Sequence, residues 1–105
     1  MHVQILYFDG CPSWQGLQER LDAAVQEVGV PAVDVELVQV QDPPQAQVRG
    51  FAGSPTVLVD GEDLFPGASP VRELACRVYR TPQGLAGSPS LEDLVIALRA
   101  RVAAG

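Results

Sequence analysis

The chain has 105 residues, of which 47% are hydrophobic, and a formal net charge of −6. This length suits one small domain with a single core, and the mixed composition is that of a globular protein and not of a disordered one. The acidic balance argues against nucleic-acid binding, because only seven basic residues are present to neutralise phosphates. We therefore expect a single domain over residues 1–105.

The first part of the chain predicts two strands separated by a helix. The mostly apolar run Val3–Phe8 fits a central strand that is covered on both faces. From Pro12 to Val28, apolar residues recur every three or four positions, which is typical of an amphipathic helix, and Gly29 stands where a helix cap belongs. Alternating apolar residues then predict a second strand within Ala32–Val40.

The middle of the chain predicts a short helix and a hairpin. Asp42 can cap a helix over Pro44–Arg49. The β-branched run Thr56–Val59 predicts a third strand, and Asp60-Gly61 is a strong signal for a tight turn. Leu64-Phe65 would form the returning fourth strand.

Two further helices are expected toward the end of the chain. One begins at Ser69-Pro70 and carries an apolar stripe as far as Val78, and the other is capped by Ser90 and reaches Val102. The stretch Arg80–Pro89 between them is rich in Gly, Pro and Ser and predicts an irregular surface segment. The order β-α-β-α-β-β-α-α predicts an α/β fold, in which a four-stranded mixed sheet carries helices on both faces.

Cys11 is the one residue that we expect to act as a nucleophile. It follows the first strand and the Asp9-Gly10 turn, and Pro12 behind it suits the first position of a helix. The free N–H groups at a helix N-terminus stabilise an anion, so the predicted pKa of Cys11 is lower than that of an ordinary cysteine. The alternative is an inert cysteine, because free cysteines are often buried as small hydrophobic residues.

Two segments resemble landmarks of the thioredoxin superfamily. The strand followed by Cys11-Pro12-Ser13-Trp14 resembles its active-site corner, and Gly53-Ser54-Pro55-Thr56 resembles its proline loop. The resemblance implies a three-layer thioredoxin-like fold, a cis peptide bond before Pro55, and thiol–disulfide exchange with a protein or small-molecule thiol or disulfide, without a cofactor. It also implies that substrate is bound by residues of both landmarks: Pro12, Trp14, Ser54, Pro55 and Thr56.

Cys76 is the candidate for a second catalytic thiol. Trp14 stands where the superfamily has the second cysteine of its Cys-x-x-Cys motif, so ordinary dithiol chemistry within the motif is absent. The predicted fourth strand runs back toward Cys11, so we expect Cys76 to come close enough to form a disulfide and to resolve a mixed disulfide made by Cys11. On the predicted helix, Cys76 would lie beside Arg72, Tyr79 and Arg80. An inert Cys76 is the alternative.

Two other function classes remain open. Thiols beside arginines could hold a soft metal ion or an organomercurial without turnover. The domain could also be a non-catalytic interaction module. A zinc site is not predicted, because the chain has no Cys-x-x-Cys and no histidine near the cysteines.

The sequence also bears on location. No apolar run approaches the ~20 residues of a membrane-spanning helix, and the first residues lack the pattern of a signal peptide. Two cysteines are too few for a disulfide scaffold, so we expect a cytoplasmic protein that does not bind a membrane. The sequence gives no indication of the oligomeric state.

Overall fold

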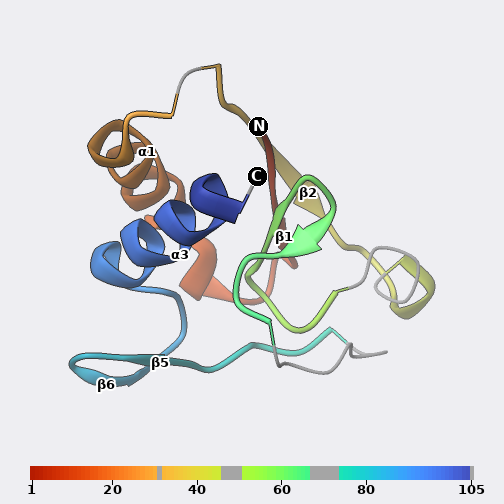
Figure 1. Cartoon of the computed structure of the whole chain (residues 1–105). Helices are drawn as coiled ribbons and strands as arrows, with labels where there is room; N and C mark the ends of the chain where they lie inside the picture. Colours follow the sequence, from red (N-terminus) through yellow and green to blue (C-terminus); the bar gives the residue numbers. More distant parts are fainter. Residues whose placement is uncertain (31, 46–50, 67–73, 105) are drawn as a thin grey trace.

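The computed structural model describes residues 1–30, 32–45, 51–66 and 74–104. A sheet with two long helices on one side forms most of this part of the chain (Figure 1). Its elements, in chain order, are β1 (His2–Tyr7), the 3-10 turn η1 (Pro12–Trp14), α1 (Leu17–Val28), β2 (Asp34–Gln39), β3 (Thr56–Val59), β4 (Glu62–Asp63), β5 (Tyr79–Thr81), β6 (Gly84–Ala86) and α3 (Leu91–Ala104).

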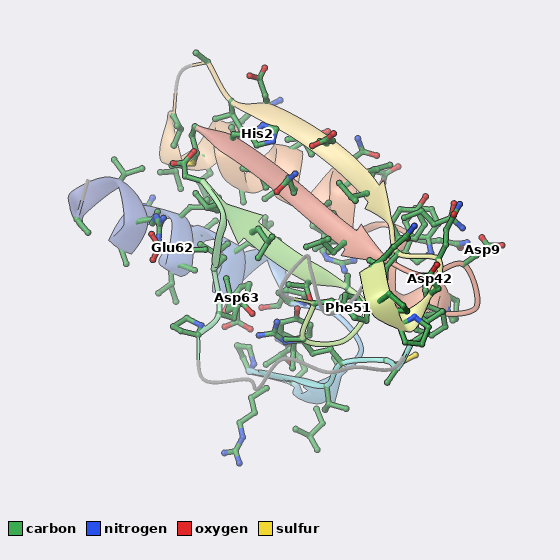
Figure 2. All side chains as sticks on the ribbon, turned by 90° about the vertical axis from the view of Figure 1, so that its right-hand side faces the viewer. His2, Asp9, Asp42, Phe51, Glu62 and Asp63 are labelled. Atoms are coloured by element: carbon green, nitrogen blue, oxygen red, sulfur yellow. The ribbon has the colours of Figure 1, made fainter. Side chains whose placement is uncertain are left out.

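The sheet has four strands in the order β2-β1-β3-β4. The central strand β1 runs parallel to β2 and antiparallel to β3, and β3 returns antiparallel into β4 through a turn at Asp60-Gly61. The prediction of an α/β fold with a four-stranded mixed sheet is confirmed. Figure 2 shows Asp9 and Asp42 at one end of this sheet, while His2 lies at the other end.

Alternation along the strands divides the core between the two faces of the sheet. α1 and α3 lie side by side on one face (Figure 1). Val3 and Ile5 of β1 point toward these helices, as do Val57 and Val59 of β3. This larger cluster consists of Val3, Ile5, Leu17, Leu21, Ala24, Val57, Val59, Leu64, Leu94, Val95 and Leu98.

A smaller apolar cluster covers the opposite face. Leu6 and Leu58, which alternate with the residues above, pack there with Val38, Val40 and Phe51. A helical turn begins at 43–45, and its start is capped by the Asp42 carboxylate, which accepts a 2.9 Å hydrogen bond from the Gln45 N–H. The remainder of the predicted short helix, 46–49, lies outside the described residues.

The predicted helix from Pro12 to Val28 is wrong in its first turn. Residues Pro12–Trp14 form only a 3-10 turn, and α1 begins at Leu17. The break falls at Gly16, whose φ of +81° lies in the left-handed region, where the α-helix cannot continue. α1 ends as predicted at Gly29, which is also left-handed.

Three predictions in the second half of the chain are corrected by the structure. The helix expected up to Val78 is absent over 74–78, which is extended, and its first part, 70–73, lies outside the described residues. The stretch expected to be irregular contains the β5–β6 hairpin, which extends below α3 in Figure 1. The fourth strand is Glu62–Asp63 and not Leu64-Phe65. No helix within the described ranges is long and apolar enough to cross a membrane.

Candidate functional site

Cys11 lies in the turn that leaves the central strand. Its N–H donates a 3.2 Å hydrogen bond to the Phe8 carbonyl, and its extended backbone precedes the 3-10 turn. The side chain of Cys11 is completely buried, whereas Pro12 next to it is exposed. The expected cause of a low pKa, the N-terminus of a long helix at Pro12, is therefore absent, because α1 begins only at Leu17. The reactivity of Cys11 stays a prediction.

The proline loop is fixed against this turn from the inside. The Ser54–Pro55 peptide bond is cis. The Ser54 hydroxyl accepts a 3.3 Å hydrogen bond from the Phe8 N–H, which ties the loop to the end of β1. The hydroxyl of the fully buried Thr56 donates to the Gly53 carbonyl at 2.6 Å and accepts from the Ala52 N–H at 3.1 Å. Thr56 thus maintains the shape of the loop from the interior. Its role in binding substrate stays a prediction.

The segment that carries Cys76 lies along the open edge of the proline loop. The Ser54 N–H donates to the Ala75 carbonyl at 2.8 Å, and the Ser54 carbonyl accepts from the Arg77 N–H at 2.9 Å. These two bonds form a parallel bridge between Ser54 and Cys76. Both backbone polar groups of Ser54 are therefore paired with the chain itself.

Glycine at position 53 makes this pairing possible. Its φ is +104°, and a Cβ atom built there would lie 2.7 Å from Cβ of Arg77 and 3.0 Å from its Cα. Contacts shorter than 3.0 Å force the neighbouring atoms to move, and here one of the neighbours is backbone. Only glycine allows the two segments to approach this closely.

The bridge brings the two cysteines together. Their sulfur atoms lie 2.8 Å apart and are not joined in a disulfide. The sulfurs of a disulfide are about 2.05 Å apart, so this pair is within roughly an ångström of bonding distance. The predicted close approach of Cys76 to Cys11 is thus observed, although an extended segment and not a helix supplies Cys76.

The two sulfurs differ in exposure and in hydrogen bonding. Cys76 is exposed, whereas Cys11 is 0% exposed. The Cys76 thiol donates to the Cys11 sulfur, and the Cys11 thiol donates to the Ser54 carbonyl at 3.6 Å. The pair is therefore asymmetric, with an outer sulfur and an inner sulfur.

The pKa of the Cys76 thiol is raised. The largest cause is the hydrogen bond to Cys11, because Cys76 must keep its proton to donate it. The slight desolvation of the Cys76 sulfur raises the pKa further, and so does the negative charge of an ionised Cys11. All three causes favour the protonated form of Cys76.

A buried arginine holds the Cys76 segment against the sheet. The guanidinium of Arg77 lies 2.7 Å from the Asp63 carboxylate and donates to the Phe65 carbonyl at 2.7 Å. It also lies over the ring of Tyr79, 4.6 Å from the ring centroid. The Tyr79 hydroxyl donates to the carbonyl of Pro55, and burial raises the pKa of Tyr79. The segment is thus anchored to β4 and to the proline loop.

The sequence analysis missed Arg77, and it placed Tyr79 beside Cys76 on a helix without its hydrogen bond to the proline loop. Residues 77–80 alternate between buried and exposed, which is the period of a strand. The pattern was concealed because one of the inward side chains is a charged arginine and the outward Val78 is apolar. The expected neighbours of Cys76 on a helix also differ, since Arg80 lies in β5 and Arg72 lies outside the described residues.

Trp14 packs on Tyr7, the last residue of β1. Its ring stacks on Tyr7, with ring centroids 4.1 Å apart and an interplanar angle of 29°. The side chain is half-buried, and its Nε1–H has no hydrogen-bond partner within the described part of the chain. A substrate-binding role for Pro12 and Trp14 stays a prediction.

Other parts of the described molecule offer no rival site with thiol chemistry. A hollow of about 640 Å³ lies at the opposite end of the sheet, lined among others by Met1, Asp60 and Arg101, and it contains no cysteine. Over the described ranges, no group of three or more His, Cys, Asp or Glu side chains is arranged to hold a metal ion.

Comparison with known proteins agrees with this geometry. A family model described as a thioredoxin domain matches residues 1–82, which include both cysteines and the proline loop. The chain therefore belongs to the thioredoxin-domain family. No curated protein and no solved structure matches the chain significantly.

Proposed function

We propose that the protein carries out reversible thiol–disulfide exchange with Cys11 and Cys76 as its redox pair. The observation that supports this most directly is the 2.8 Å distance between the two sulfurs, held by the backbone bridge between Ser54 and Cys76. Membership of the thioredoxin-domain family makes such a role plausible. The second thiol comes from a distant segment, which replaces the cysteine that Trp14 displaces from the usual motif.

The exchange balances as a two-electron reaction. In the reduced protein, the Cys76 thiol donates a hydrogen bond to the Cys11 sulfur. Reaction with an external disulfide forms the Cys11–Cys76 bond and releases two thiols from the external disulfide, which take up the two protons of the cysteine thiols. In the reverse direction, two external thiols are oxidised and the protein disulfide is reduced.

The substrate class is a protein or small-molecule thiol or disulfide. In the cytoplasm, where we place the protein, thiols are kept reduced, so the resting form would be the dithiol. Disulfides in that compartment are transient and usually belong to catalysis or sensing.

Mild oxidation followed by peptide mapping tests the proposal. We expect an intramolecular Cys11–Cys76 disulfide, a loss of both free thiols, and thiol-dependent recovery of both. Cys11→Ser and Cys76→Ser should each abolish the disulfide while leaving the circular dichroism spectrum unchanged. Recovery of only intermolecular disulfides or sulfenic acid, with Cys76 still free, would contradict the proposed pair.

A second candidate function is the binding of a soft cation by the same two sulfurs. The observation that favours it is that two thiols meet where one of them is open to solvent. Thiolates prefer soft ions such as Cu(I). Titration of the reduced protein with Cu(I) should then give one site that each cysteine variant loses. Binding that survives Cys76→Ser would exclude a two-sulfur site.

A further inference from the structure

We propose that external thiols and disulfides react at Cys76 and that Cys11 is the inner sulfur, so that the mixed disulfide with substrate forms on Cys76. This inference rests on the proposed exchange function and names the sulfur and the substrate class that it uses. It reverses the order expected from the sequence, in which Cys11 attacked the substrate and Cys76 resolved the mixed disulfide.

The first argument is access. A thiol–disulfide exchange requires three sulfurs in line, so the attacked sulfur must be open on the side opposite to its leaving partner. Cys76 is exposed, whereas Cys11 is 0% exposed and its sulfur contacts Cys76 and the Ser54 carbonyl. An external sulfur can therefore reach Cys76 directly, and it can reach Cys11 only after the Cys76 segment has moved.

The second argument is that the edge of the proline loop is already filled. The resemblance implies that an extended substrate pairs with the backbone beside Pro55. Here the N–H of Ser54 donates to Ala75 and its carbonyl accepts from Arg77. Cys76 thus occupies the position that a substrate cysteine would take, and no polar backbone group of Ser54 is left for a peptide.

The anchors of the segment make its displacement costly. Arg77 is only 7% exposed and bonds to the Asp63 carboxylate and the Phe65 carbonyl, and Tyr79 donates to the Pro55 carbonyl. Removing a buried arginine from its partners leaves charges and carbonyls without compensation. We therefore assign small thiols and disulfides, which need no backbone pairing, as the substrates.

Thiol–disulfide exchange at Cys76 can run in both directions. When the protein disulfide is reduced, a small thiolate attacks Cys76 Sγ, the Cys11–Cys76 bond breaks, and Cys11 leaves as the thiolate. A second thiolate attacks the sulfur of the small molecule, which releases Cys76 and a small disulfide. In the oxidising direction, an ionised Cys11 accepts the proton of Cys76, and the Cys76 thiolate attacks the small disulfide and releases a first small thiolate. This thiolate then takes the proton from Cys11. Cys11 attacks the Cys76 sulfur, the Cys11–Cys76 bond forms, and the second small thiolate leaves.

Single-cysteine variants test which sulfur is reached, because neither can form the intramolecular disulfide. Cys11→Ser keeps Cys76, and Cys76→Ser keeps Cys11. Each folded variant is mixed with glutathione disulfide, and formation of the glutathione adduct is followed by mass spectrometry over a range of pH. The rates on the alkaline plateau are compared, so that differences in ionisation do not enter.

We expect Cys76 to react at least about tenfold faster than Cys11, because a buried thiol reacts only during local opening. In denaturant, the two variants should react at similar rates. A ratio below about tenfold in the folded state, or the same ratio in denaturant, would overturn the assignment. If the wild type formed no internal disulfide while this ratio held, the redox pair would fail and Cys76 would still be the accessible sulfur.

A second probe tests the substrate class. A flexible peptide whose single cysteine is joined to glutathione offers the same leaving thiol together with an extended backbone. With Cys11→Ser, we expect this peptide to react no faster than glutathione disulfide. A reaction about tenfold faster would show that the protein docks an extended chain, and it would overturn the restriction to small substrates.

Discussion

At the scale of single residues, Gly53 controls the approach of the two segments that carry the site. Gly53→Ala should lower the free energy of unfolding by about 1–3 kcal/mol through the clash with Arg77, in addition to the strain of its positive φ. The clash pushes the Cys76 segment away from the proline loop. Urea unfolding measures the stability, and the yield of the internal disulfide measures the separation of the sulfurs.

Gly84→Ala is the matched control for this change. Gly84 has a φ of +109°, and a Cβ atom there would meet nothing within 4 Å. Its substitution should cost about 1–2 kcal/mol from backbone strain alone and should leave disulfide formation unchanged. Equal losses in the two variants would show that the approach of Arg77 to Gly53 does not matter.

Cys76 supplies a second prediction at this scale. Its pKa is raised chiefly by its hydrogen bond to Cys11, with the charge of Cys11 adding to the effect. Cys11→Ser removes that charge and the thiolate acceptor, so the pKa of Cys76 should fall toward the value of an ordinary cysteine, about 8.5. At neutral pH, Cys76 should then be alkylated faster in the variant than in the reduced wild type. A pH profile of alkylation that is unchanged by the substitution would contradict the coupling of the two thiols.

At the scale of elements, the extended segment before β5 depends on the ion pair between Arg77 and Asp63. The two side chains are only 6% and 20% exposed. Arg77→Met would leave the Asp63 carboxylate and the Phe65 carbonyl without their partner, and it should cost about 3 kcal/mol of stability. The internal disulfide should also form more slowly, because the segment is no longer held beside Cys11.

Arg101→Met provides the control for the loss of an arginine. Arg101 pairs at 2.9 Å with Glu62, and it also donates to the Val59 carbonyl at 3.0 Å. The Arg101 and Glu62 side chains are 26% and 74% exposed, so this ion pair is more open to water than that of Arg77. Its removal should cost no more than about 1 kcal/mol, and disulfide formation should be unaffected. If the two variants unfolded at the same urea concentration, the burial of Arg77 would not make its ion pair contribute more to stability than that of Arg101.

The helices and strands also show which parts of the fold could be predicted from apolar patterns in the sequence. β1, β2, β3, α1 and α3 follow simple apolar periods, and all five were predicted, with boundaries that differ by a few residues. The prediction of a helix up to Val78 was wrong over 74–78 because the apolar pattern there is weak. Pairing with the proline loop decides the conformation of this segment. The N–H and the carbonyl of Ser54 require hydrogen-bond partners, and Gly53 leaves room for the segment that supplies them.

The site was predictable in part for the same reason. The position of Cys11 after a strand and the proline loop are local features, and the meeting with Cys76 followed from the direction of the fourth strand. Burial is not local, so the sequence could not show that Cys11 is covered and that Cys76 is open. The anchoring arginine was hidden because charged residues normally lie on the surface.

At the scale of the whole molecule, the two cysteines join parts of the chain that are far apart in sequence. A disulfide between residues 11 and 76 would close a long loop and restrict the unfolded chain. The loop-closure relation gives a gain of about 4 kcal/mol for the oxidised protein. We therefore expect the oxidised form to unfold at a higher urea concentration than the reduced form.

The stability difference should vanish in Cys76→Ser, which cannot form the bond and serves as the control. The wild type and Cys76→Ser are each measured without reductant and with an excess of reductant. An oxidised wild type that is no more stable than the reduced protein would mean that bond formation distorts the fold by as much as it restricts the unfolded chain.

The asymmetry of the sulfur pair also bears on damage by peroxide. Because Cys76 is exposed, we expect its sulfur to react with peroxide before that of Cys11 and to form a sulfenic acid. Further oxidant would convert this sulfenic acid irreversibly to the sulfinic acid. The Cys11 sulfur lies 2.8 Å from the Cys76 sulfur in the reduced protein, so the Cys11 thiol can condense with that sulfenic acid to give a disulfide and water. The buried thiol would thus protect the exposed one against irreversible oxidation, because the disulfide can still be reduced and the sulfinic acid cannot.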